Sequence, residues 1–142
     1  MQETARAEKW LYSVLSGDTG AGGVNTLVGG RIYAYLAPER SAYPLVIFSH
    51  QGDYDVMGVG TARILASTLY QVKAVGKASA VSMMSLQAIA DRIDALLQGA
   101  SGTVTGGEIV SCVREQQISY VEYAESAVYG HLGGLYRIQI TH

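Results

Sequence analysis

The sequence predicts an α+β fold in which an antiparallel or mixed sheet of about four to five strands carries two main helices packed on it. Two amphipathic helical patterns, at residues 3–16 and 82–98, stand among strand-like apolar runs. These helices and strands do not alternate regularly, so a mainly parallel sheet built from βαβ units is not expected. A chain of 142 residues suits one core, and we predict a single domain over residues 1–142.

Segment 3–16 is the first predicted helix. Its apolar residues recur at helical spacing along one stripe, and Gly17 suits a C-cap. In the glycine-rich loop that follows, residues 24–28 are expected to form one helical turn that packs Leu27 inward. The stripe of the first helix consists of Ala7, Leu11, Val14 and Leu15, with Trp10 at its edge.

Three strand candidates occupy the next part of the chain. Residues 31–36 form the first, and the only two prolines bracket the loop after it. Residues 44–49 form a nearly continuous apolar run, typical of a strand covered on both faces. The polar segment 50–60 contains three glycines and is predicted as a loop. Residues 65–75 form the third strand, and alternation places Tyr70, Val72 and Ala74 on the same face of it.

Segment 82–98 has the clearest pattern in the chain. Apolar residues at i, i+3, i+4 and i+7, with polar residues opposite, predict an amphipathic helix with one buried stripe. Ser82 suits its N-cap and Gly99 its end. The buried stripe is expected to contain Leu86, Ile89, Ala90, Ile93, Leu96 and Leu97.

The C-terminal third is predicted to be β. After a loop or short strand at residues 100–107, strands are expected at 108–113, 118–123 and 135–141. The last of these alternates apolar and polar residues, which suits a strand with one solvated face. The sequence GHLGG at 130–134 is predicted as a turn, because glycine tolerates positive φ.

Composition favours a protein whose surface is covered by other subunits. Charged residues make up only 15% of the chain, against about 25% in an average domain, and ten of its twelve aromatic residues are tyrosines. Tyrosine is enriched in interface cores, where charges are depleted. The alternative is a surface covered by Ser, Thr, Gln and Gly. A formal net charge of −2 excludes nucleic-acid binding driven by bulk positive charge.

The sequence predicts neither a metal site nor an intrachain disulfide. The single cysteine, Cys112, excludes an intrachain disulfide and a zinc site with two Cys ligands, and its apolar strand indicates a core position. The three histidines are widely separated. Segment 53–64 starts like a calcium loop, but Met57 and Ile64 stand where oxygen ligands belong. We predict no metal and no cofactor.

Catalytic and nucleotide-binding motifs are also missing from the sequence. No Walker sequence is present, and the glycine run at 20–23 follows a helix rather than a strand. Ser49 and His50 are neighbours on a predicted strand, so their side chains should point to opposite faces, which argues against a triad with Asp53. An enzyme is therefore not predicted, and no catalytic residue is proposed. The N-terminus does not resemble a signal peptide, and no apolar window suits a membrane span.

Several stretches resemble the tail-terminator (tail-completion) proteins of long-tailed bacteriophages. The segment LVGGRIYAYLAPERSAYPLVIF, residues 27–48, is similar to the opening of that family, where a short helix, a proline-containing bridge and an apolar strand follow one another. The helix ending in ALLQG and the final YGHLGGLYRIQI fit the same order, so that the resemblance covers residues 11–140. It implies a ring of identical subunits, typically six, that caps the tail tube, stops its polymerisation and presents a surface for the head connector. DNA would pass through the lumen without being read.

The resemblance sets our expectations for partners. They are further copies of the chain, the tail tube protein and a head–tail connector or head-completion protein, in the virion neck and, during assembly, in the host cytoplasm. A connector ring next to the terminator, or a small ligand-binding or catalytic α+β domain, are the alternative functions. The tyrosines expected at subunit interfaces, or else in the chain's own core, are Tyr33, Tyr35, Tyr120, Tyr123 and Tyr136.

The segment 51–61 is the candidate docking loop. It is long enough to reach a neighbouring ring, and its alternative is an ordinary mobile loop. The partner-binding residues predicted in it are Gln51, Asp53, Tyr54, Asp55 and Met57.

Overall fold

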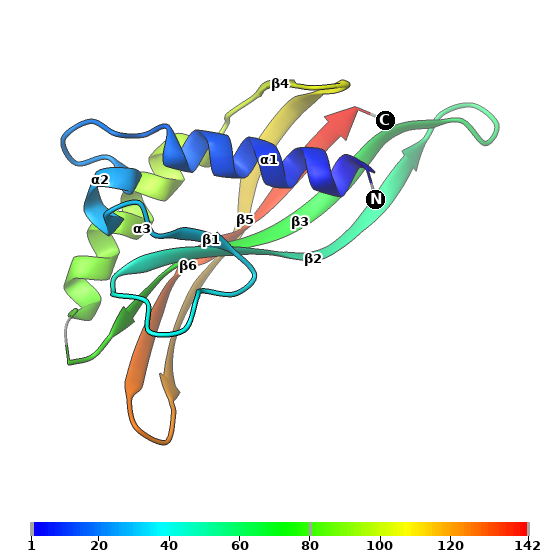
Figure 1. The fold of residues 1–142 in the computed structure, drawn as a ribbon. Coiled ribbons are helices and arrows are strands. Elements are labelled where there is room, and N and C mark those ends of the chain that lie inside the picture. Colours follow the sequence, from blue (N-terminus) through cyan, green and yellow to red (C-terminus); the bar gives the residue numbers. More distant parts are fainter. Residues whose placement is uncertain (1, 80, 142) are drawn as a thin grey trace.

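The computed structural model describes residues 2–79 and 81–141, which form three helices and six strands (Figure 1). In chain order these are α1 (Gln2–Ser16), α2 (Val24–Val28), β1 (Ile32–Ala34), β2 (Leu45–Met57), β3 (Arg63–Lys77), α3 (Met83–Leu97), β4 (Gly102–Val104), β5 (Gly107–Tyr123) and β6 (Val128–Thr141). None of these helices combines the length and apolar character that a membrane crossing requires.

The strands form one mixed sheet in the order β1-β2-β3-β6-β5-β4. β1 pairs with β2 in parallel, and the other neighbours are antiparallel. The predicted α+β class with a mixed sheet is therefore confirmed. The sheet has six strands instead of four to five, and one of them, β4, has only three residues, in a segment where a loop or a short strand was expected. Besides the two main helices, the third is α2, the single helical turn expected at residues 24–28.

Helices α1 and α3 lie over one face of the sheet and enclose the core (Figure 1). Both predicted apolar stripes are buried, as Leu11 and Leu15 of α1 and Ile93 of α3 show. They meet strand residues such as Phe48 and Ile138 in one cluster. The start of α3 is capped as expected, because the Ser82 hydroxyl accepts a hydrogen bond from the Ser85 amide at 3.2 Å.

The predicted loop 50–60 was wrong, because β2 continues to Met57 and pairs with β3 as a long hairpin. The register shifts between His50 and Gly52 and again at Met57, which interrupts the alternation expected of a strand. Several residues of this part are exposed, so the sequence lacks a buried apolar row. Only residues 58–62 form the turn.

The predicted turn at 130–134 was wrong for a different reason. These residues lie inside β6, and the actual turn is at 124–127, where the Ala124 amide donates to the Ala127 carbonyl. A Cβ on Gly133 would overlap the Val72 carbonyl oxygen of β3, so glycine serves here as a close-approach residue. The two strands expected at 108–113 and 118–123 are one strand, β5, with a register shift around Glu115.

Two smaller expectations changed, and a third is confirmed. Leu27 is exposed, and Val24 and Val28 turn inward instead, since a five-residue helix presents only one narrow face. The first strand ends at Ala34, because Tyr35 adopts a positive φ of 66°. The buried positions of Tyr70 and Cys112 confirm the predicted core.

Candidate functional site

Two hairpins project from the body of the fold, at opposite ends of the sheet (Figure 1). One is formed by β2 and β3, and the other by β5 and β6. Because each extends beyond the helices, neither can bury its outer residues within this chain. They are the surfaces best placed to contact another molecule.

The tip of the β2–β3 hairpin is apolar. Val59 is fully exposed, and Met57 and Ile64 are each 54% exposed. The Gly58 amide donates to the Ala62 carbonyl at 2.7 Å and closes the turn, and the Ile64 side chain packs against Gly58. A fixed turn therefore presents three aliphatic side chains to solvent. The sequence analysis predicted Met57 as a partner-binding residue but did not select Val59 or Ile64. Of these two, Val59 stands in the same run as Met57, VMGVG at residues 56–60.

The remaining predicted docking residues line the stem of this hairpin. Asp53 accepts a hydrogen bond from Thr4 of α1 at 3.4 Å. Tyr54 lies on the opposite face of the sheet, with its ring 5.3 Å from the guanidinium carbon of Arg137. These contacts hold the stem against the body. The five predicted residues thus share one hairpin but divide between two faces.

Two more of the predicted docking residues, Asp55 and Gln51, also contact other residues of the hairpin stem. The Asp55 carboxylate lies 3.7 Å from the Arg63 guanidinium across the hairpin. Gln51 sits at the bulge, exposed, and its side-chain amide donates to the Ser49 hydroxyl at 3.0 Å. Of the five, Met57 alone extends to the apolar tip.

The β5–β6 hairpin has a polar stem and an acidic tip. The Tyr120 ring stacks on His131 at 4.4 Å, and the Tyr120 hydroxyl accepts from Lys73 at 2.7 Å. Glu122 lies 3.0 Å from the His131 Nε2 atom. Burial lowers the pKa of His131, so its ring is neutral at physiological pH and does not cancel the charge of Glu122. Residues 121–126, which include Glu122 at the end of this stem and form the tip, are exposed.

The interface tyrosines expected from the sequence divide into two groups. Tyr35 and Tyr120 are partly exposed, and Tyr123 is 81% exposed at the β5–β6 tip. Tyr136 is buried and donates its hydroxyl to Asp94 at 3.0 Å, so it belongs to the core. The last strand alternates as predicted, and its Tyr136 face is the one that meets the helices.

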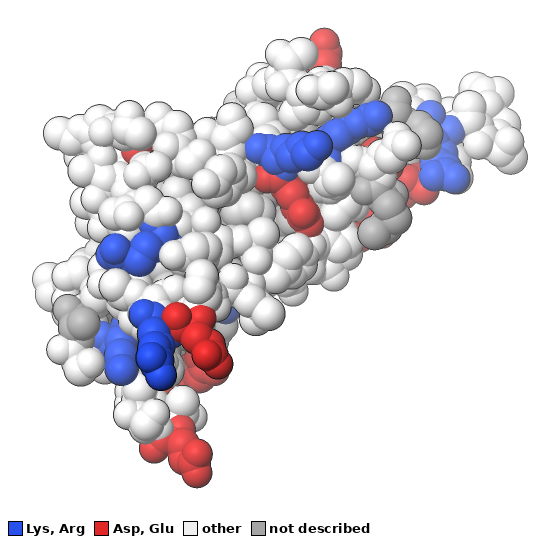
Figure 2. Space-filling model, viewed as in Figure 1, with Lys and Arg blue, Asp and Glu red and all other residues white. Residues whose placement is uncertain are grey.

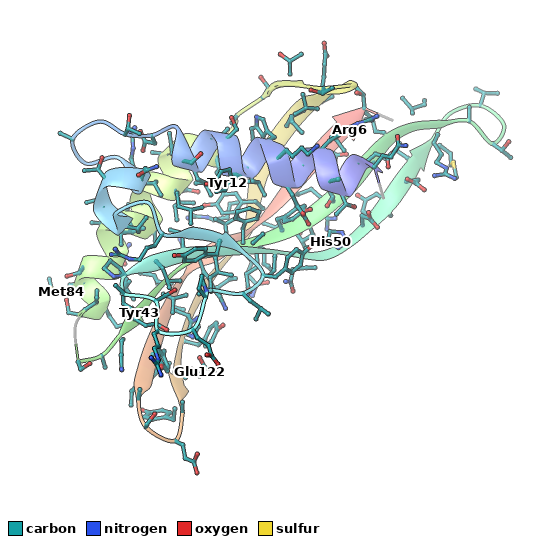
Figure 3. All side chains as sticks on the ribbon, in the orientation of Figure 1. Arg6, Tyr12, Tyr43, His50, Met84 and Glu122 are labelled. Carbon is teal, nitrogen blue, oxygen red and sulfur yellow. The ribbon has the colours of Figure 1, made fainter. Side chains whose placement is uncertain are left out.

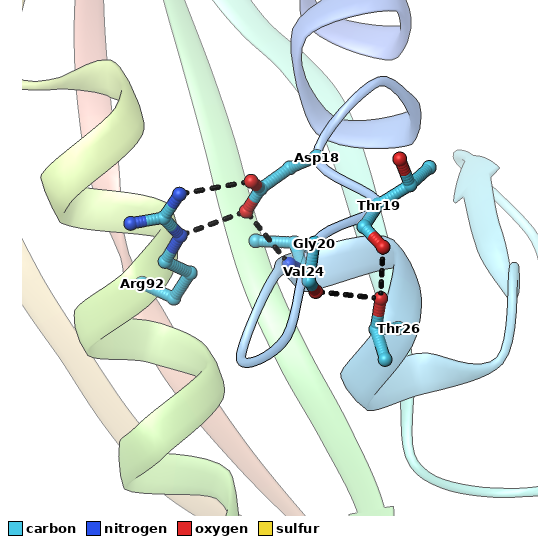
Figure 4. Close-up of polar contacts among 6 residues, drawn as sticks. All are labelled: Asp18, Thr19, Gly20, Val24, Thr26 and Arg92. Atoms are coloured by element: carbon cyan, nitrogen blue, oxygen red, sulfur yellow. Dashed lines mark hydrogen bonds and ion pairs between the residues drawn. The ribbon is translucent and has the colours of Figure 1, made fainter.

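A polar clamp fixes the segment between α1 and α2 against α3 (Figure 4). The Arg92 guanidinium donates two hydrogen bonds of 2.8 Å to the Asp18 carboxylate, which also accepts from the Val24 amide at 2.8 Å. The hydrogen bonds from Arg92 hold the pKa of Asp18 below its ordinary value. On the same segment, the Thr26 hydroxyl lies 2.9 Å from the carbonyl oxygens of Thr19 and Gly20.

The residue types of a hydrolytic triad do not converge as a triad. His50 packs edge-on against Tyr70 on the helix-covered side, 3.7 Å from Asp53. Ser49, its neighbour on the strand, instead contacts Gln51. Within residues 2–79 and 81–141, no group of three His, Cys, Asp or Glu side chains is arranged to hold a metal ion.

The comparison with known proteins shows a shared fold. No protein-family model and no curated protein sequence matches the chain. Among solved structures, it is similar to a chain in the virion of a native gene transfer agent particle, with a TM-score of 0.69. The two chains share one fold. The match covers 93% of this chain and 92% of the other, at 17% sequence identity, so it extends over nearly the whole architecture.

Proposed function

We propose that this chain is a structural assembly protein of a phage-like virion, and that its place is the neck, as a tail terminator. The observation that carries the proposal is the fold shared, over nearly the full length of both chains, with a component of a gene transfer agent virion. The resemblance of residues 27–48 to tail-terminator proteins gives the more specific position. The proposed activity is binding, and no reaction is assigned to any residue.

The apolar tip of the β2–β3 hairpin is the proposed contact with the tail tube. A ring of copies, six in the family that the sequence resembles, would present one tip per subunit to the last tube ring. Burying Val59, Met57 and Ile64 contributes roughly 3–5 kcal/mol per subunit, from about 1.5–3 kcal/mol for a fully buried aliphatic side chain, reduced for two that are already half covered. Because all tips bind together, modest contacts sum to a stable cap that occupies the growth surface of the tube.

The proposed ring leaves its other surface for the head–tail connector. DNA passes through the lumen without specific contacts, for which a subunit with a formal net charge of −2 is suited, since it offers no excess of cations to the phosphates. The chain is then found in the virion neck, and in the host cytoplasm during assembly.

Deletion of the gene, followed by electron microscopy of the particles, tests this proposal. Loss of a terminator leaves tube growth unchecked, so overlong tails without heads are expected. Tails of normal length that fail to join filled heads would instead favour the connector ring, the neighbouring position in the neck. Normal, infectious particles would refute a role in the neck. A map of the wild-type particle that places this fold on the last tube ring would be the direct demonstration.

A further inference from the structure

A groove lies between α1 and β4, and no side chain of residues 2–79 or 81–141 fills it. Its volume is about 440 Å³, within the range of about 300–1,000 Å³ typical of ligand clefts. It lies along the exposed side of α1 and beside β4, which is an edge strand of the sheet. The residues that line it are Gln2, Ala5, Arg6, Lys9, Trp10, Ser13, Thr103, Val104 and Thr105.

The charged groups that line this groove are cations. Trp10 is 6% exposed, and its indole N–H reaches the solvent of the groove. Gly102 leaves room for this ring, since a Cβ there would lie 2.8 Å from the Trp10 Nε1 atom. Arg6 donates to the neutral side chain of Gln2, and neither Arg6 nor Lys9 forms an ion pair with a described carboxylate. Two cations beside a solvent-accessible indole N–H fit a segment that carries carboxylates.

The tip of the β5–β6 hairpin has the complementary chemistry. Its exposed residues 121–126 carry Glu122 and Glu125 and no cation, and they include Tyr123, which is 81% exposed. Tyrosine is a typical interface anchor. The formal charge of the tip is −2 and that of the groove is +2, so their potentials attract.

The two surfaces lie at opposite ends of the molecule, so one chain cannot join its own tip to its own groove. Figure 2 shows Lys and Arg side chains along α1 and acidic side chains on the β5–β6 hairpin at the far end of the same view. Figure 3 places the labelled Arg6 and Glu122 in the same way, one on α1 and the other on that hairpin. A contact between different surfaces of identical chains is head-to-tail, and repeated contacts of this kind form a ring when the rotation between copies closes and an open filament when it does not.

We propose that the β5–β6 hairpin tip of one copy binds in the α1–β4 groove of the next copy. The Glu125 and Glu122 carboxylates face Lys9 and Arg6, and Tyr123 packs near Trp10. This inference rests on the proposed function, because it names the contact that builds the ring. It leaves the β2–β3 tip of every subunit available for the tail tube.

Charge reversal tests this contact. The variants are Lys9→Glu in the groove and Glu125→Lys at the tip, and the matched control is Glu39→Lys, a reversal on an exposed loop. Sedimentation velocity of the purified chain, up to about 1 mM and at low and high salt, gives the association constant. Each variant is expected to weaken association at least tenfold, as is high salt, while the control stays within about twofold. Thermal unfolding of each variant shows whether it is folded.

Mixing the two variants provides the decisive measurement. In an equimolar mixture, each wild-type tip meets a wild-type groove, and each charge-reversed tip meets a charge-reversed groove, so association is expected to return to near the wild-type level. Carbodiimide coupling of mixed ¹⁵N-labelled and unlabelled wild-type chains checks the same contact without substitutions. It is expected to join Lys9 of one copy to Glu125 or Glu122 of another.

Three outcomes would overturn the inference: a chain that stays monomeric at 1 mM, an oligomer indifferent to both reversals, or a mixture that fails to reassociate. A virion map in which an acidic segment of a different protein fills the groove would overturn it too. None of these results contradicts the proposed function, which the tail phenotype and the position of the chain in the particle decide independently.

Discussion

Substituting Gly133 by alanine is expected to destabilise the fold strongly, because β6 has no room for a side chain there. An ideal Cβ would overlap the Val72 carbonyl oxygen and lie 2.5 Å from the Lys73 Cα, which is 0.9 Å short of the 3.4 Å at which ordinary contact begins. The obstacles are backbone atoms of the neighbouring strand. A change of rotamer therefore cannot relieve the clash, and β3 and β6 must separate locally.

The size of the effect follows from this separation. Inserting a methyl group into a filled space costs about 1–3 kcal/mol, and each weakened ladder hydrogen bond adds about 1 kcal/mol. With one or two bonds affected, the expected loss is about 2–5 kcal/mol. For a domain of this size the midpoint of thermal unfolding should fall by roughly 6–20 °C.

Gly52→Ala is the matched control. Gly52 follows the bulge in β2, and a Cβ there meets no described atom within 4 Å. The control should change stability by less than about 1 kcal/mol, and in the stabilising direction if alanine restricts the unfolded chain. Urea unfolding of both variants, followed by circular dichroism, measures the difference. Equal stabilities would refute the view that the approach of β3 and β6 demands glycine at this position.

Three further predictions concern the clamp, the thiol and the hairpin tip. Asp18→Asn should cost about 1–2 kcal/mol at pH 7, since it weakens a bidentate charge-assisted pair with Arg92. Because the folded pKa of Asp18 is lowered, this contribution is complete above the ordinary value near 3.8 and is lost as the pH falls through the folded value. Urea unfolding at pH 7 and pH 3 should therefore show the variant and wild type converging in acid, and an undiminished gap would contradict the assignment. Burial raises the pKa of Cys112 to about 12, so a thiol reagent at pH 8 should label it only on unfolding, and rapid labelling of the native protein would show that the core opens there. Val59→Asp should leave the free energy of unfolding within about 0.5 kcal/mol of wild type, because the side chain is fully exposed, but should abolish complementation of the deletion in particle assembly. Normal complementation by that variant would remove the β2–β3 tip from the proposed tube contact.

The sequence was informative wherever one face of an element meets the core. The helix at 82–98 was predictable because its buried residues repeat at helical spacing, and Ser82 marks its start. The last strand was predictable because only one of its faces is covered, which leaves a clean alternation. Cys112 was correctly placed in the core, since it lies among apolar strand residues.

Prediction failed where a strand leaves the core or bends. The outer half of β2 projects beyond the helices, so exposure on both faces removed the alternation, and the bulge at Gln51 shifted what remained. In β6, Gly133 and Gly134 were interpreted as turn residues, but they stand where other side chains would collide with β3 and β5. A single sequence does not distinguish a glycine needed for positive φ from one needed for close approach.

The groove was beyond sequence reasoning for a topological reason. Arg6, Lys9 and Trp10 lie on α1, whereas Thr103 follows α3 in the chain, and only the folded sheet brings the two segments together. Its counterpart was partly visible, since Tyr123 was among the expected interface tyrosines.

The proposed role in the neck is better served by the proposed head-to-tail contact than by a symmetric one. An isologous pair buries the same patch on both partners and turns them in opposite directions. A cap between a tube and a head needs all its copies facing the same way, with one rim for each neighbour. Using the β5–β6 tip and the α1–β4 groove for lateral contacts keeps every subunit in one orientation. In the proposed ring, the apolar β2–β3 tips of all copies then lie at the same level, so one rim would bind the tube and the other rim would present a different surface to the head.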